Sequence, residues 1–385
     1  MKNIEGKVSV DFNIKSLIHK ISQSAKLAIF IVVLAKIIVL AIGYLVTYLN
    51  TGPAPPLTIV MSMFNHWDAP HYVDIAKYWY VNTGDAANFI VFFPLYPILI
   101  RLFTVDFSYI NLSALIVSNV CSLIAFFYLY KLAKLEFNDS VAVKSVLFLS
   151  VFPTAYFLSA PYTEGLFFAL IIASIYYARL GKWQFAGSLS LLAALTRIEG
   201  LILLPVLLVE YFHQKSWKPR KTDLKILWIF LALAGFLIYL GLNYQVTGSP
   251  FTFITVEATH WYNRIDPRSG LTAAYGWARN ASYPNNITVG IAPIAFAIFG
   301  LLMVGVSLWR RLRPVYTVYM ALSLALAVST SWWISVPRYV MAMFPIFIII
   351  GALTRKKGVN IAIAIASGAV LCYFTVFFAL GWWAF

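Results

Sequence analysis

The densest group of residues able to do chemistry is the nine-residue stretch from His66 to Asp74, which also contains Asp68 and His71. If this stretch is helical from Asp68, then Asp68 and His71 lie three residues apart on one face, and Asp74 lies about 240° away from Asp68. A carboxylate beside aromatic side chains suits a general base. Asp68 is equally suited to cap a helix that begins at Ala69, because Asp at the N-cap and an early Pro are both favoured. Both roles remain open, and they are compatible.

The same stretch offers a candidate metal site, since Asp68, His71 and Asp74 are all ligand types for divalent ions. Their helical spacing argues against convergence on one ion. The two cysteines, Cys121 and Cys372, stand alone in apolar runs and build neither a disulfide framework nor a metal cluster. We therefore predict no cofactor, and a divalent metal ion at this stretch stays open as the less favoured alternative.

Two further places carry isolated charges. Arg338 stands alone beside an apolar segment, where a planar, always-charged guanidinium suits a lipid phosphate. The alternative is an arginine that extends to lipid headgroups. Arg197 and Glu199 stand two residues apart between apolar runs. They are expected to form an internal ion pair at the interruption between two helices.

These residues need a membrane scaffold to position them. Of the 385 residues, 61% are hydrophobic and only 11% are charged, whereas soluble domains carry about a quarter charged residues. Several apolar runs reach the ~20 residues that cross a bilayer. The net charge of +15 is distributed in short clusters between apolar runs, which is typical of the positive-inside rule and argues against a nucleic-acid partner. The predicted fold class is an all-α polytopic membrane protein.

Charge placement predicts a topology with the N-terminus in the cytoplasm. Residues 1–26 form a cytoplasmic amphipathic segment, and residues 27–385 form a single transmembrane domain with two long outer loops, 50–108 and 247–286, that contain interfacial helices. Eleven segments are expected to lie in the membrane: Leu27–Leu49, Tyr109–Tyr130, Val141–Leu158, Tyr162–Leu180, Trp183–Thr196, Gly200–Phe212, Ile226–Val246, Ile287–Leu308, Val315–Ser331, Tyr339–Ala352 and Ile361–Leu380.

The segments on either side of Arg197 are short. A single merged helix would reverse every later loop and place the basic cluster from Lys215 to Lys225 outside. We therefore predict two short helices that meet at Arg197-Ile198-Glu199, beside a cavity lined by protein rather than lipid.

Four motifs carry a resemblance to a known family. The first outer loop holds His66-Trp67-Asp68-Ala69-Pro70-His71-Tyr72, followed by Phe92-Phe93-Pro94-Leu95-Tyr96-Pro97. Three shorter motifs follow in order: Ala160-Pro161-Tyr162-Thr163-Glu164-Gly165-Leu166-Phe167, Thr196-Arg197-Ile198-Glu199-Gly200, and Gly248-Ser249-Pro250-Phe251 with Trp261 and Arg264 downstream. In this order they resemble the GPI mannosyltransferase II family, which adds the second mannose of GPI anchors and has prokaryotic relatives. Glu199 and Ser249 depart from its usual residues.

The resemblance implies a GT-C fold with about eleven membrane helices, a polyprenyl- or dolichyl-phosphate-sugar donor and an inverting transfer. It implies that Asp68, the acidic residue of the first outer loop, is the catalytic base. The residues expected to bind substrate are His66, Trp67, His71, Asp74, Glu164, Arg197, Glu199, Trp261, Arg264 and Arg338.

The expected partners are the lipid-phosphate donor, a lipid-linked or glycan acceptor and membrane lipids, and the sequence leaves an accessory membrane subunit open. The expected location is a prokaryotic plasma membrane with an extracytoplasmic active site. Two alternatives remain. One is a GT-C enzyme for another sugar or a protein acceptor, and the other is a transporter or lipid flippase, which would favour internal repeats and charges in mid-membrane.

Overall fold

The computed structural model describes residues 22–385, so most of the predicted amphipathic segment 1–26 lies outside the described residues. From residue 22 onward the chain is helical without strands, apart from one isolated bridge between Ile265 and Thr330. The α-helices are α2 (Gln23–Thr51), α3 (Pro56–Phe64), α4 (Asp68–Tyr78), α5 (Leu95–Phe103), α6 (Ile110–Glu136), α7 (Asp139–Ser150), α8 (Glu164–Arg179), α9 (Trp183–Ala194), α10 (Leu203–Gln214), α11 (Leu231–Thr247), α12 (Thr252–Thr259), α13 (Pro267–Asn280), α14 (Ala292–Trp309), α15 (Pro314–Val328), α16 (Val336–Ala342), α17 (Pro345–Leu353) and α18 (Lys357–Ala379). Short turns of other helix types connect them: η1 (Asp85–Val91), η2 (Phe107–Tyr109), η3 (Ala155–Leu158), η4 (Ile198–Ile202), η5 (Pro219–Lys221), η6 (Leu224–Phe230), η7 (Asn286–Ile291) and η8 (Trp333–Ser335).

Among residues 22–385, five helical stretches are long and apolar enough to cross a membrane: Gln23–Thr51, Phe107–Glu136, Leu224–Thr247, Asn286–Trp309 and Lys357–Ala379. Two bent pairs, Asp85–Val91 with Leu95–Phe103 and Trp333–Ala342 with Pro345–Leu353, raise the number to seven if each is one span. Each of the eleven predicted segments overlaps at least one α-helix. The chain is thus an all-helical membrane protein, and the count of eleven crossings stays a prediction.

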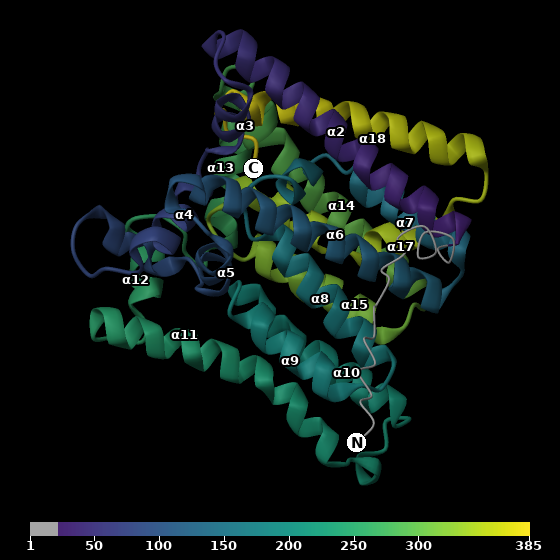
Figure 1. The fold of residues 1–385 in the computed structure, drawn as a ribbon. Helices are drawn as coiled ribbons and strands as arrows, with labels where there is room; N and C mark the ends of the chain where they lie inside the picture. The colour runs from purple at the N-terminus through teal and green to yellow at the C-terminus, as the bar shows by residue number, and fades with distance from the viewer. Residues whose placement is uncertain (1–21) are drawn as a thin grey trace, which may run out of the picture.

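Helix α8 lies at the centre of the bundle. Nearly all of its residues are buried, and it packs between α6 and α9. Helices α2 and α18 lie side by side on one flank, and α11 packs against α9 on the other (Figure 1). The short helices α3, α4, α5, α12 and α13 gather at one end of the long helices, on the left of Figure 1. This end is called the α4 end below.

The predicted break at Arg197 is confirmed. Helix α9 ends at Ala194, Arg197 has an extended backbone, and η4 leads into α10. The turn is so tight that a Cβ at Gly200 would lie 2.3 Å from the carbonyl carbon of Ala193, which only glycine avoids.

A neutral ion-pair cluster ties the helices together at the opposite end. Glu210 on α10 has a fully buried side chain, and both of its oxygens accept hydrogen bonds from Arg313, at 2.7 and 2.8 Å. Arg179 on α8 bridges Glu210 and Glu136 on α6. Two carboxylates and two guanidinium groups balance, so this inner clamp joins α6, α8, α10 and the start of α15 without leaving an unpaired buried charge.

Candidate active site

Asp68 occupies the first turn of α4 and does not cap it. The N-cap position is Trp67, whose φ of 56° is unusual for a residue with a side chain, and no side chain caps this helix. The capping role expected for Asp68 is therefore wrong, because the helix begins one residue earlier than Ala69. Tertiary contacts hold the uncommon backbone in place: Trp67 stacks on Trp383 with ring centroids 3.8 Å apart. The hydroxyl of Tyr162 donates a 2.6 Å hydrogen bond to the backbone oxygen of His66.

The irregular segment that precedes α8 is fixed by buried polar side chains from two other helices. Lys36 on α2 donates to the side chains of Asn119 and Ser159 and to the backbone oxygen of Leu158, at 2.8 to 3.3 Å. Ser118 on α6 donates to the backbone oxygen of Tyr162 at 2.8 Å. Backbone carbonyl groups in this non-helical segment lack helical hydrogen-bond partners, and these side chains supply hydrogen bonds to them inside the bundle. They thereby position Glu164, the first residue of α8.

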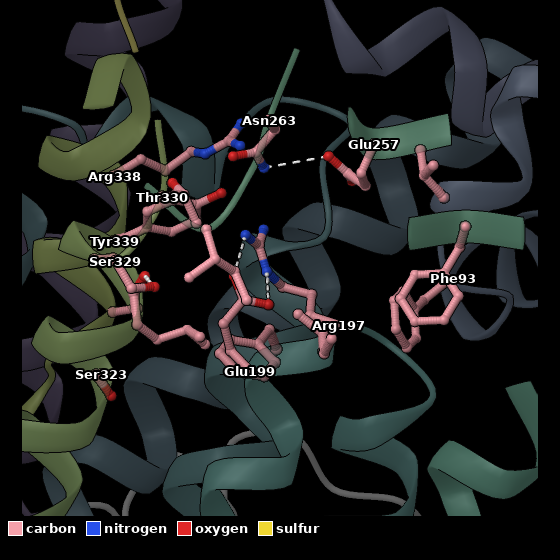
Figure 2. Close-up of a pocket in the computed structure, with 18 of the residues that line it drawn as sticks. Phe93, Arg197, Glu199, Glu257, Asn263, Ser323, Ser329, Thr330, Arg338 and Tyr339 are labelled. Atoms are coloured by element: carbon pink, nitrogen blue, oxygen red, sulfur yellow. Dashed lines mark hydrogen bonds and ion pairs between the residues drawn. The ribbon is translucent and has the colours of Figure 1, made fainter. Parts of the chain in front are cut away.

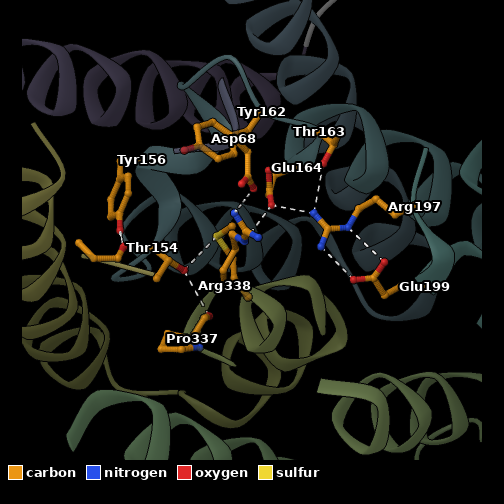
Figure 3. Close-up of polar contacts among 12 residues, drawn as sticks. Asp68, Thr154, Tyr156, Tyr162, Thr163, Glu164, Arg197, Glu199, Pro337 and Arg338 are labelled. Atoms are coloured by element: carbon orange, nitrogen blue, oxygen red, sulfur yellow. Dashed lines mark hydrogen bonds and ion pairs between the residues drawn. The ribbon is translucent and has the colours of Figure 1, made fainter. Parts of the chain in front are cut away.

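Arg338 joins two of the candidate residues. Its Nη1 lies 3.3 Å from Oδ2 of Asp68, and its Nε lies 3.3 Å from Oε1 of Glu164 (Figure 3). The Arg338 side chain is only 9% exposed. The alternative in which Arg338 extends to lipid headgroups is therefore wrong, because the guanidinium points into the protein and is paired there.

Arg197 extends the same arrangement. Its Nη1 lies 2.9 Å from Oε1 of Glu164 and 3.1 Å from the hydroxyl of Thr163. Its Nη2 lies 2.9 Å from Oε1 of Glu199, which confirms the predicted internal ion pair (Figure 3). Glu164 thus stands between two guanidinium groups, and its second oxygen, Oε2, is buried without a hydrogen-bond partner among residues 22–385.

Asp68, Arg338, Glu164, Arg197 and Glu199 together form what we call the charge network. Three carboxylates and two guanidinium groups give a formal charge of −3 + 2 = −1. The inner clamp at the opposite end is balanced and joins four helices, whereas the charge network carries an excess carboxylate. Ionisable groups inside a membrane protein are costly and are functional candidates by default.

Two cavities meet at the charge network. The large cavity, about 600 Å³, is lined mainly by apolar side chains, among them Phe236, Phe251, Phe253, Ile254 and Leu326. Figure 2 shows part of its lining, including Arg197, Arg338 and Tyr339. The small cavity, about 320 Å³, contains Asp68 and is walled by four tryptophans: Trp67, Trp261, Trp332 and Trp383. Nine residues line both cavities: Val91, Phe93, Arg197, Ile198, Glu199, Glu257, Asn263, Arg338 and Tyr339. The two cavities are therefore adjoining, and the two guanidinium groups stand at their junction.

The predicted site residues divide into two groups. Most of them line a cavity: Asp68, Trp67, His71 and Trp261 the small one, Glu164 and Arg264 the large one, and Arg197, Glu199 and Arg338 both. His66 and Asp74 line neither. His66 packs edge-on against Phe378, and Asp74 is exposed on the other side of α4, as the helical spacing predicts.

His71 lies in an aromatic environment formed by Phe89, Phe92 and Trp261, with ring centroids 4.4 to 5.6 Å away. Burial lowers the pKa of His71, which opposes the effect of Asp68 and the other nearby carboxylates. A neutral imidazole at this position can both donate and accept a hydrogen bond at the wall of the small cavity.

Glu257 and Asn263 complete the junction, and neither was predicted as a site residue. Glu257 belongs to α12, outside the spanning helices, and Asn263 Nδ2 donates to its Oε2 at 3.2 Å (Figure 2). Burial raises the pKa of Glu257 to about 7, with further contributions from Asp68 and Glu199. In the sequence, the signal that could have pointed to Glu257 is that it is the single acidic residue in the otherwise uncharged segment 252–259.

Within the part of the chain that the structure describes, no three His, Cys, Asp or Glu side chains lie together as metal ligands. Both cysteines are free thiols and are partly buried.

Comparisons with known proteins support a functional class. Residues 93–240 match the family model described as dolichyl-phosphate-mannose-protein mannosyltransferase. The matched range contains Glu164, Arg197 and Glu199. Neither the curated proteins nor the solved structures give a match. With its apolar helices, this match supports an integral membrane glycosyltransferase of the mannosyltransferase type, within the GT-C superfamily that uses polyprenyl-phosphate-sugar donors.

Proposed function

We propose that this protein is an inverting mannosyltransferase that moves mannose from a polyprenyl-phosphate donor to a hydroxyl of a lipid-linked or glycan acceptor. The observation that carries the proposal is the ion pair of Asp68 and Arg338, which stands where an apolar cavity and a tryptophan-walled cavity adjoin. The reaction needs a base beside the acceptor and a cationic group that binds the donor phosphate. The small cavity offers the first and the large cavity the second.

The large cavity suits the donor lipid. Its apolar lining is compatible with the first isoprene units of the polyprenyl chain. Arg338 and Arg197, at its junction with the small cavity, offer planar guanidinium groups to the phosphate. Loss of the phosphate as a leaving group requires no protonation by the enzyme, because the guanidinium groups stabilise the charge that develops on it.

Asp68 acts on the acceptor side. Its carboxylate takes the proton of the acceptor hydroxyl, the hydroxyl oxygen forms a bond to the anomeric carbon, and the bond from that carbon to the phosphate oxygen breaks. The electron pair of the broken bond leaves with polyprenyl phosphate, and the anomeric configuration inverts. The proton on Asp68 is released to solvent, which fits a side chain that is 28% exposed.

The finer assignments rest on the sequence. The motifs around Asp68, Glu164 and Arg197 support a member related to GPI mannosyltransferase II of the prokaryotic type, and the charge distribution supports eleven crossings with a cytoplasmic N-terminus. The α4 end would then face away from the cytoplasm, at the outer surface of the plasma membrane.

A second candidate function is transfer to a protein hydroxyl, because the matched family model is described as a protein mannosyltransferase. The small cavity favours a glycan over a peptide, since its four tryptophans offer the flat apolar surfaces that stack on sugar rings.

The test is a transfer assay with purified protein in lipid nanodiscs, polyprenyl-phosphate-mannose labelled in the sugar, and separate glycolipid and peptide acceptors. We expect label to move to a glycolipid and the product linkage to be inverted. Transfer to peptide alone would favour the second candidate. In a parallel assay with the protein reconstituted in sealed vesicles, translocation of the donor without any transfer would favour a flippase and contradict the proposal.

A further inference from the structure

Glu257 and Asn263 hold a distinctive place in the protein. Among the nine residues common to both cavities, Arg197, Glu199 and Arg338 belong to the charge network, whose guanidinium groups are proposed to bind the donor phosphate. Apart from Tyr339, Glu257 and Asn263 are the other members with polar side chains. If the donor phosphate lies at Arg338 and the acceptor hydroxyl at Asp68, the sugar between them lies at this junction.

The two side chains are held in a fixed arrangement. The backbone N–H of Asn263 donates to the backbone oxygen of Glu257 at 2.8 Å, and the Asn263 side chain donates to Glu257 Oε2 at 3.2 Å. The backbone N–H of Trp261 closes the same turn on Val256 at 3.3 Å. The pair is therefore preorganised by its own loop, which limits the entropy lost when a ligand binds.

The pair also has unused hydrogen-bonding capacity. Asn263 Oδ1 is buried and has no hydrogen-bond partner in the described chain. A buried polar atom left unpaired costs free energy, so a ligand that donates to it is favoured. Glu257 Oε1 makes no hydrogen bond to another described side chain either. An amide oxygen and a carboxyl oxygen from one rigid turn match the hydroxyl groups of a pyranose ring.

We propose that Glu257 and Asn263 bind hydroxyl groups of the transferred sugar and set the sugar specificity of the enzyme. This inference rests on the proposed function, because it assumes that the donor phosphate occupies Arg338. It adds a role for the second outer loop: the first loop supplies the base, and α12 with the turn after it recognises the sugar.

The test compares two ligands that share the lipid phosphate and differ in the sugar: polyprenyl-phosphate-mannose and polyprenyl phosphate. Because the first is a phosphodiester with one negative charge and the second a phosphomonoester with a second ionisation near pH 6, each variant is compared with wild type for the same ligand at the same pH. Binding of each to the full-length protein in nanodiscs is measured for wild type, Glu257→Leu and Asn263→Ala. Thr255→Val is the control, because Thr255 is exposed on the same helix and lines neither cavity. We expect both cavity variants to bind the mannose-bearing donor about ten-fold more weakly or worse, because each loses a hydrogen bond to the ligand. Their affinity for polyprenyl phosphate should not change at pH 6, where the Glu257 carboxyl is mostly neutral.

A second measurement uses donors whose mannose lacks one hydroxyl group. Wild type should discriminate against the deoxy sugar that removes the partner of Glu257 or Asn263, and the matching variant should lose that discrimination. Glu257→Gln should retain part of it, because an amide still binds a hydroxyl. Equal weakening of both ligands, or unchanged binding of the mannose donor by variants that remain folded, would overturn the inference. Failure of wild type to bind polyprenyl phosphate would instead contradict the proposed function.

Discussion

Asp68 and Arg338 are separated by 270 positions in the chain, yet Oδ2 of one lies 3.3 Å from Nη1 of the other. Asp68 is the proposed base, and Arg338 is proposed to bind the donor phosphate. The two proposed functional groups are therefore paired with each other in the structure. A phosphate that takes over the Nη1 hydrogen bond now accepted by Asp68 would displace the carboxylate from Arg338. We therefore expect the base to be released when the donor binds and to re-form the pair when the lipid phosphate departs.

This competition predicts that Asp68→Asn binds polyprenyl phosphate more tightly than wild type. The substitution removes an anion that competes for Arg338, so we expect a gain of up to roughly ten-fold, the worth of one charge-assisted contact. Binding to protein in nanodiscs measures it, and Asp74→Asn, on the exposed face of the same helix, should show no gain. Unchanged or weaker binding by Asp68→Asn would mean that Asp68 and the phosphate do not compete.

Arg338 itself should control donor affinity. Arg338→Gln removes a charge-assisted contact worth ~1.5–3 kcal/mol, so the KM for the donor should rise roughly ten-fold or more. Arg338→Lys should recover only part of the affinity, because lysine lacks the planar fork that spans Asp68 and Glu164. The melting temperature of each variant should be measured in parallel. Donor dependence that stays at the wild-type value in Arg338→Gln would remove this residue from the phosphate site.

The sequence predicted the parts of the site that depend on local patterns. Arg197 and Glu199 stand two residues apart at a chain break, so their ion pair follows from proximity alone. The 3.6-residue period of α4 predicted that Asp74 points away from Asp68. The positions of the apolar helices followed from hydropathy, because a membrane helix must be apolar over most of its length.

The rest of the site depends on tertiary contacts that leave no local signal. The contact of Asp68 with Arg338 joins the first turn of α4 to α16, which lie far apart in the sequence. The start of α4 was predicted one residue late, because stacking of Trp67 on Trp383 stabilises a backbone that propensity disfavours. Asn263 has no charge that would have marked it in the sequence. Glu257 is one of several acidic residues expected outside the membrane, and only the fold, which brings it near Asp68 and Glu199, distinguishes it from the others.

Donor affinity should depend on pH through Glu257, whose pKa is raised to about 7. The charged groups facing it are Asp68 on α4, Glu199 on η4, and Arg197, Arg264 and Arg338 in the same cavities. Below pH 7 the carboxyl is mostly protonated and neutral. As the pH rises through 7 it becomes negative beside the anionic phosphate, so the KM for the donor should increase.

The control for this pH dependence is Glu257→Gln, which keeps the shape and removes the ionisation. Its donor KM should be flat across the same range. A profile identical to wild type would assign the titration to another group, of which His71 is the nearest candidate, since its side chain also lines the small cavity.

The inner clamp should affect stability and leave substrate affinity unchanged. Glu210→Gln leaves Arg313 and Arg179 without their shared buried carboxylate, and loss of one partner from a buried ion pair costs ~3–5 kcal/mol. We expect a clear drop in melting temperature with an unchanged donor KM at temperatures where the variant is folded. A changed KM with an unaltered melting temperature would show that the clamp communicates with the site.

The central claim, that Asp68 is the base of a glycosyl transfer, is tested most directly by the initial rate of Asp68→Asn with saturating donor. Saturation removes the effect of donor affinity, and Asp74→Asn is the matched control on the same helix. A positioned base contributes ~10²–10⁴-fold to the rate. We predict that Asp68→Asn loses transfer by this factor while it remains folded and binds donor, and that Asp74→Asn stays close to wild type. Transfer by Asp68→Asn at nearly the wild-type rate would contradict the account.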